Sequence, residues 1–315
     1  MILNILFIII GFSLLVKGAD FLVNGSISIA KKLRIPTIII GLTIVSIGTS
    51  MPEFVVTLTS SIKGHSDLAI GNVIGSNISN LFLILGVCAS LKSLKFKDET
   101  VKLEIPIVIF LTSLLYILGN NGTKKEINKL EGLLLVIFCI LFILYNIYMA
   151  RRNSMNDAGE DKNISIGKTF FNIIIGIIGL KYGGDFVVNG ASRLAISMGI
   201  SEKMISLTIV AFSTSLPELI TSITATIKGE IDMAIGNVMG SNIFNIVLII
   251  GATALINPIE YSLSYNKDII MLLIGMIVLN IIPFIGEKNK ISRIGGFAYI
   301  ISYLSYMISL VKISG

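Results

Sequence analysis

The sequence predicts an all-α polytopic membrane protein with ten transmembrane helices, arranged as two inverted five-helix repeats. Three observations predict this fold. Of the 315 residues, 54% are hydrophobic and only 14% are charged, whereas a soluble protein carries roughly 25% charged residues. Ten apolar runs approach or exceed the roughly 20 residues that a helix needs to cross a bilayer. The two halves of the chain are copies with five runs each, so the second copy enters the bilayer from the opposite side.

The ten runs are joined by short polar connections. The net charge of +6 comes largely from lysine and arginine in these connections, where they orient a membrane protein rather than bind nucleic acid. Cys88 and Cys139 lie inside runs and are expected to be buried, without a disulfide or a metal site. The start of the chain does not have the pattern of a cleavable signal peptide. The runs cover residues 2–29, 37–62, 68–91, 101–119, 130–150, 168–196, 203–227, 231–256, 268–285 and 293–313.

The two copies align at a constant offset of 165 residues, without a gap. Residues 18–86 align with 183–251, and 35 of these 69 positions are identical. Chance does not produce this identity, so the chain is an internal duplication. We expect the first repeat over residues 1–150, a cytoplasmic linker over 151–167 and the second repeat over 168–315.

The positive charges predict an orientation. With both termini outside, the cytoplasmic connections and their flanks hold fifteen lysines and arginines, and the other side holds eight. Positive residues collect on the cytoplasmic side of membrane proteins. We therefore expect a multi-pass protein of the plasma membrane with both termini outside, although the cluster from Lys124 to Lys129 opposes this bias.

A proline and a carboxylate interrupt the second run of each repeat. The two segments are Thr49-Ser50-Met51-Pro52-Glu53 and Thr214-Ser215-Leu216-Pro217-Glu218. Proline breaks the hydrogen bonding of a helix interior, and an ionisable side chain inside a membrane indicates a functional site. The third run of each repeat contains Gly-Asn-x-x-Gly-Ser-Asn, from residue 71 and from residue 236. We expect the second, third, seventh and eighth helices to be broken.

These segments bring together hard oxygen donors: two carboxylates, amides, hydroxyls and freed backbone carbonyls. Calcium takes six to eight such oxygens, whereas zinc and copper prefer thiolate or imidazole ligands, and the single histidine, His65, lies in a loop. Two buried carboxylates need one divalent cation, more than one monovalent cation, or protons. The alternative is that the glutamates only cap polar backbone and that the serines and asparagines only join helices.

The doubled motifs resemble the two alpha repeats of the cation/calcium exchanger superfamily, most closely the prokaryotic sodium/calcium exchangers. The resemblance covers essentially the whole chain, and it implies that the first and sixth helices slide against a core that holds the ions. It implies that Glu53 and Glu218 bind calcium with the carbonyls of Thr49 and Thr214. It further implies that sodium uses Ser46, Ser50, Ser76, Ala211, Ser215 and Ser241, and that Asn80 and Asn245 complete the centre.

Two positions depart from the family pattern. Ser213 replaces a usual glycine, and Asn245 stands where potassium-dependent relatives carry aspartate. The resemblance implies an antiporter with Ca²⁺ and Na⁺ as substrates, without a cofactor, an obligate protein partner or enzymatic activity. Protons or another cation remain alternatives to sodium, because protons neutralise the same carboxylates. An intramembrane enzyme or a channel is the least supported class, since no nucleophile–base pair is visible.

Each repeat also carries an acid and an amide in its first run, Asp20 with Asn24 and Asp185 with Asn189. Lys17 precedes Asp20 by three residues, and Lys181 precedes Asp185 by four. Residues at these spacings are neighbours on one helix face. We therefore expect local ion pairs within the first run of each repeat.

Overall fold

The structure, a computed structural model, describes residues 2–152, 165–198, 211–285 and 289–314. Within these residues, seven helices are long and apolar enough to cross a membrane, or eight if one bent pair counts as a single span. The predicted helical membrane fold is therefore confirmed, while the count of ten crossings stays a prediction. Nine of the ten predicted runs agree with helices to within four residues at each end, and the run at 203–227 is described only from residue 211.

The first half contains one long helix, a bent second span and three further spans. Short π-helical segments, labelled η1 to η3, interrupt or begin some of these helices without ending them. The elements are α1 (Ile2–Leu33), α2 (Thr37–Ile40), η1 (Gly41–Val45), α3 (Ser46–Thr49), α4 (Met51–Ile62), α5 (Ser66–Ile78), η2 (Ser79–Ile84), α6 (Leu85–Leu91), β1 (Leu94–Lys95), η3 (Thr100–Glu104), α7 (Ile105–Asn120), β2 (Glu126–Ile127) and α8 (Lys129–Arg152).

The described residues of the second half, which leave out 199–210, follow the same order. Its π-helical segment η5 matches η2, and η6 is a single 3₁₀ turn. The elements are α9 (Ile166–Ser197), α11 (Ala211–Ser213), α12 (Leu216–Ile227), α13 (Ile231–Phe244), η5 (Asn245–Ile250), α14 (Gly251–Ile256), β3 (Ile259–Glu260), η6 (Leu263–Tyr265), α15 (Asn266–Ile285), β4 (Lys290–Ile291) and α16 (Arg293–Ser314).

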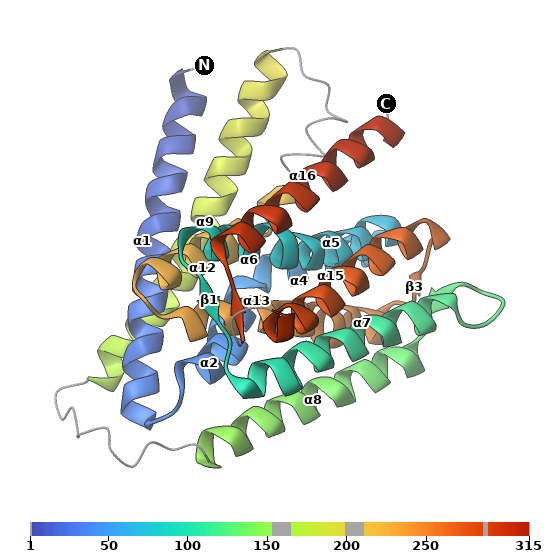
Figure 1. The fold of residues 1–315 in the computed structure, drawn as a ribbon. Helices are drawn as coiled ribbons and strands as arrows, with labels where there is room; N and C mark the ends of the chain where they lie inside the picture. The colour runs from blue at the N-terminus through green and yellow to red at the C-terminus, as the bar shows by residue number, and fades with distance from the viewer. Residues whose placement is uncertain (1, 153–164, 199–210, 286–288, 315) are drawn as a thin grey trace.

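Two long antiparallel helices, α1 and α9, lie beside a bundle formed by the other helices. Figure 1 shows α1 and α9 side by side at the left of the view, and the remaining helices to their right. The spans Ser66–Leu91 and Ile231–Ile256 are the most enclosed, because 78% of each apolar window is buried against other helices. The start of α1 and the end of α16 lie toward the same side of the molecule.

The predicted break is confirmed in the second span, where the helices on either side of Ser50 meet at 46°. In the seventh span, two turn residues, Thr214 and Ser215, separate α11 from α12. The predicted breaks in the third and eighth spans are wrong, because Ser66–Leu91 and Ile231–Ile256 each run as one helix. Their Gly-Asn-x-x-Gly-Ser-Asn motifs lie in regular α-helix, in α5 and α13, and a π-helical segment follows each motif, η2 after α5 and η5 after α13.

Two miniature antiparallel sheets tie the halves together, and the sequence did not indicate them. The strand β1 pairs with β4, and β2 pairs with β3, so each sheet takes one strand from each half. An apolar residue of every strand is buried: Leu94, Ile127, Ile259 and Ile291. Strands of two residues are too short to produce an alternating pattern that a sequence could show.

The predicted local ion pairs are wrong. Asp20 pairs with Lys228, a residue of the other repeat, at 2.5 Å. Lys181 lies over the ring of Tyr182, 5.2 Å from its centroid. The expected burial of the two cysteines is confirmed, because Cys88 is 1% and Cys139 is 3% exposed.

Candidate functional site

Both glutamates of the interrupted runs lie in the first turn of a helix. Glu53 follows Pro52 at the start of α4, and Glu218 follows Pro217 at the start of α12. Each proline lacks an N–H, so it leaves a carbonyl of the preceding turn without its helical partner. A helix N-terminus carries partial positive charge, which favours a carboxylate there. The breaks therefore place two carboxylates and freed carbonyls together.

The two carboxylates are buried and only partly hydrogen-bonded. Glu53 and Glu218 are each 1% exposed, and they are close enough for their charges to interact. Ser50 donates a hydrogen bond of 2.9 Å to Oε1 of Glu218. Both carboxylate oxygens of Glu53 and Oε2 of Glu218 have no hydrogen-bond partner. Burying charged oxygens without a partner is costly, so three of the four oxygens are available to a positively charged ligand.

Hydroxyl contacts connect the two repeats around these carboxylates. The hydroxyl of Ser50 lies 3.1 Å from that of Ser241, and the hydroxyl of Ser215 lies 3.5 Å from that of Ser76. The two contacts are copies of each other, because Ser215 and Ser76 stand 165 positions from Ser50 and Ser241. The site is thus shared by the repeats, since each repeat contributes one half of every contact.

The threonines of the motifs contact asparagines in the same crossed manner. Thr49 donates to Oδ1 of Asn237 at 3.2 Å, and Thr214 donates to Oδ1 of Asn72 at 3.3 Å. Asn72 in turn donates to the backbone carbonyl of Glu53 at 3.2 Å. These asparagines therefore fix the backbone that carries the glutamates.

Asn80 and Asn245 are held by a second crossed pair. The amide group of Asn80 donates to Oδ1 of Asn242 at 3.2 Å, and that of Asn245 donates to Oδ1 of Asn77 at 2.9 Å. The carbonyl oxygens of both Asn80 and Asn245 are buried without a partner. Each amide is thus oriented by its nitrogen and keeps its oxygen available.

Ser46 lies beside the site, against the opposite repeat. It is fully buried, and its hydroxyl donates to the carbonyl of Thr43 at 3.2 Å. Its contact with α13 requires glycine at position 240, because a Cβ there would lie 2.6 Å from the Ser46 hydroxyl. Ala211 is the first residue of the described segment α11.

Four asparagines take part in the site without having been predicted as site residues: Asn72, Asn77, Asn237 and Asn242. Their signal was present, since all four lie inside the doubled Gly-Asn-x-x-Gly-Ser-Asn motif. The motif does not reveal which asparagines face the carboxylates and which hold a partner in place. That distinction needs the helix rotation, which depends on packing between the repeats.

The donor set consists of oxygens. Among the described residues, no group of three or more histidine, cysteine, aspartate or glutamate side chains could hold a metal ion. Two carboxylates with surrounding hydroxyl, amide and backbone oxygens remain. Such a set suits hard cations that accept many neutral oxygen ligands.

A family profile matches almost the entire chain. It is described as sodium/calcium exchanger protein and matches residues 3–148 and 168–312. The chain belongs to the sodium/calcium exchanger family. Its relatives are transporters, so it is a membrane antiporter and not an enzyme.

Named relatives match along their full length. The chain is 33% identical to the putative antiporter CaxA of Alkalimonas amylolytica, covering 97% of this chain and 98% of that protein. It is 31% identical to the sodium/calcium exchanger MaX1 of Methanosarcina acetivorans, covering 98% and 99%. Among solved structures, the sodium-calcium exchanger NCX_Mj superposes with a TM-score of 0.84 at 31% identity, covering 98% of this chain and 99% of that one.

Proposed function

We propose that this exchanger carries Ca²⁺ and Na⁺ in opposite directions across the plasma membrane, using one central site that opens to each side in turn. Glu53 and Glu218 are the principal ligands of calcium. The neutral ligands are the predicted oxygens of Thr49, Thr214, Ser46, Ser50, Ser76, Ala211, Ser215, Ser241, Asn80 and Asn245.

The observation that carries this proposal is the unpaired state of the buried carboxylates. Three carboxylate oxygens of two adjacent glutamates have no hydrogen-bond partner, although both side chains are 1% exposed. A divalent cation neutralises both carboxylates together, and two or more monovalent cations or protons do the same. The competing cations therefore bind in turn, and this competition couples their transport.

The topology that fits this function is ten spans in two inverted repeats, with both termini outside. Support comes from the crossed contacts between residues 165 positions apart, and from the shared side of the two chain ends in Figure 1. An inverted pair of repeats makes two nearly equivalent arrangements available to one chain. Alternating exposure of a shared site follows from this equivalence.

Exchange of calcium against protons is the second candidate. The same buried carboxylates favour it, because a proton neutralises a carboxylate as a metal ion does. The relatives named for sodium and calcium exchange support sodium. The two functions make opposite predictions for the driving ion.

The test is uptake of radiolabelled calcium into proteoliposomes. One set of vesicles carries an outward sodium gradient, and a matched set carries a pH gradient of equal driving force. We expect uptake driven by sodium and little uptake driven by pH alone. Uptake that responds only to pH would overturn the sodium proposal and support the proton exchanger.

A further inference from the structure

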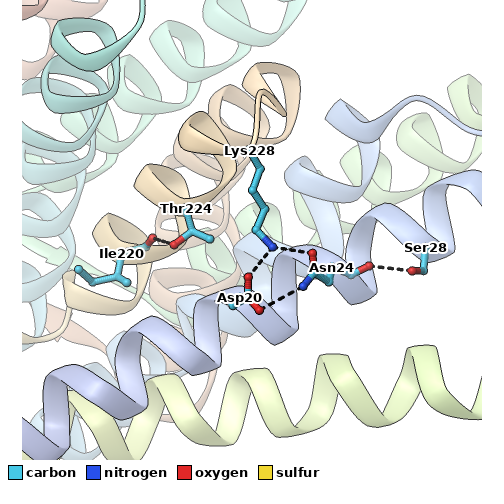
Figure 2. A network of polar contacts seen from close by, with 6 residues as sticks. All are labelled: Asp20, Asn24, Ser28, Ile220, Thr224 and Lys228. Atoms are coloured by element: carbon cyan, nitrogen blue, oxygen red, sulfur yellow. Dashed lines mark hydrogen bonds and ion pairs between the residues drawn. The ribbon is translucent and has the colours of Figure 1, made fainter.

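An ion pair outside the central site ties α1 to the helix that carries Glu218. Figure 2 shows Lys228 reaching from the end of α12 to Asp20 and Asn24 on α1. Its Nζ atom lies 2.5 Å from Oδ1 of Asp20 and donates to Oδ1 of Asn24, also at 2.5 Å. Asn24 donates to Oδ2 of Asp20 at 3.2 Å, which closes a three-residue cluster.

Helix α1, which Lys228 contacts, packs tightly against α9. A Cβ at Gly18 would lie 2.7 Å from the backbone nitrogen of Leu180, and a Cβ at Gly183 would lie 2.7 Å from that of Leu15. Such close backbone approach through small residues joins two membrane helices into one unit. The contact of Lys228 is therefore a polar link between the α1/α9 pair and the bundle that holds the site.

The same three residues occur again in the other repeat. Asp185, Asn189 and Lys63 each stand 165 positions from Asp20, Asn24 and Lys228.

Each lysine caps its helix and precedes a glycine of positive φ, +79° at Gly64 and +84° at Gly229. The two lysines are thus presented by the same local backbone. Each repeat contains an aspartate, an asparagine and a lysine. A cluster combines the aspartate and asparagine of one repeat with the lysine of the other.

The second cluster is open in this structure. Lys63 and Asp185, which both lie within the described residues, form no ion pair with each other, and their side chains are exposed. The amide of Asn189 donates instead to the backbone carbonyl of Asp185 at 2.8 Å. The aspartate, the asparagine and the lysine are the same in both repeats, and we attribute the difference to the position of the α1/α9 pair against the bundle.

We propose that the two clusters are alternating latches. The latch of Lys228, Asp20 and Asn24 holds the arrangement seen here, and a latch of Lys63, Asp185 and Asn189 forms in the inverted arrangement. This inference rests on the proposed alternating access, in which the α1/α9 pair and the bundle exchange one set of contacts for the other.

The latch is strong enough to bias the two states and weak enough to open. The side chains of Lys228 and Asp20 are 27% and 46% exposed, so water competes for both charges. Exposed ion pairs of this kind shift an equilibrium by about threefold to fivefold. A much stronger latch would trap the exchanger in one state.

Cross-linking tests whether the two latches exclude each other. Cysteines replace Asp20 and Lys228, or Asp185 and Lys63, in a protein whose native Cys88 and Cys139 are alanine. A propane-bridged bis-methanethiosulfonate spans the length of a lysine side chain, which a direct disulfide does not. We expect each pair to cross-link, each cross-link to stop exchange until it is reduced, and only one to form in a molecule carrying both pairs. Both cross-links in one molecule would overturn the proposal.

Removing the charge of Asp20 tests whether its ion pair with Lys228 sets the equilibrium between the two arrangements. Asp20→Asn should speed the cross-linking of cysteines at 63 and 185 by about threefold, because the latched state loses its ion pair. Ser28→Ala is the matched control, since the Ser28 hydroxyl bonds only the Asn24 backbone carbonyl, at 2.8 Å. The charge swap Asp20→Lys with Lys228→Asp should restore the slower rate. An unchanged rate in Asp20→Asn would refute the latch.

These measurements are independent of the transported ion. If sodium fails to drive calcium uptake while the cross-links exclude each other, the proposed function fails and the latch stands. If sodium drives uptake while both cross-links form together, the function stands and the latch fails.

Discussion

Replacing Glu53 by glutamine tests the central site most directly. The substitution keeps the size of the side chain and removes one of the two negative charges. Glu53 is 1% exposed, and neither of its carboxylate oxygens has a hydrogen-bond partner. The substitution therefore breaks no hydrogen bond of Glu53, and its effect on calcium is that of the lost charge.

The expected loss of calcium binding is large. At a contact of about 2.4 Å and an effective dielectric constant of about 20, a divalent cation and a carboxylate attract each other by about 14 kcal/mol. Removing the carboxylate from water offsets several kcal/mol of this attraction. A remaining loss of only about 4 kcal/mol weakens calcium binding about 1,000-fold.

The folded protein should tolerate the substitution. Two buried carboxylates repel each other when no cation is bound, so Glu53→Gln should leave the melting temperature in calcium-free detergent unchanged or raise it. In the wild-type protein, calcium at 100 times its dissociation constant stabilises the folded state by about 2.7 kcal/mol. The variant should lose this stabilisation together with exchange.

The assay combines thermal unfolding with and without calcium and uptake in proteoliposomes. Glu104→Gln is the matched control, because Glu104 is also buried, at 4% exposure, and its Oε2 has no hydrogen-bond partner. Glu104 lies outside the doubled motifs, so its variant should keep calcium stabilisation and transport. Calcium stabilisation that persists in Glu53→Gln would refute the assignment of the site.

Two further comparisons use the repeat copies as controls. Ser50→Ala removes a hydrogen bond of 2.9 Å to a carboxylate, and bonds to charged groups contribute about 1.5 to 3 kcal/mol, so the free energy of unfolding in calcium-free detergent should fall by about that amount. Ser215→Ala, whose hydroxyl contacts another hydroxyl at 3.5 Å, should lower it by less than about 1 kcal/mol, and equal effects would contradict the geometry. Gly240→Ala places a Cβ 2.6 Å from the Ser46 hydroxyl, and should destabilise the protein by about 1 to 3 kcal/mol in thermal unfolding. Gly75→Ala meets nothing within 4 Å and should be neutral, so an equal loss in both would contradict the packing seen here.

The sequence alone determined the membrane fold, the duplication and the chemical character of the site. Proline and glutamate inside a run of spanning length are costly in any helix within a bilayer, so their repeated occurrence signals function without any knowledge of packing. The constant offset of 165 residues paired every site residue with its copy. The family followed from the same motifs.

The sequence did not determine how the copies meet. The third and eighth helices run unbroken because their glycines and asparagines keep the α-helical backbone while they pack against the other repeat, and the motif by itself does not distinguish this packing from a break. The two-residue strands between the halves depend on loops that are distant in the sequence.

The partner of Asp20 was decided only by the tertiary structure. Lys17 is its neighbour along the helix, yet Lys228 from the other repeat holds it at 2.5 Å. The duplicated residues make two equivalent sets of contacts possible, and a single chain geometry satisfies only one set at a time. The sequence therefore determines which residues can meet, and the placement of the α1/α9 pair against the bundle decides which of them do.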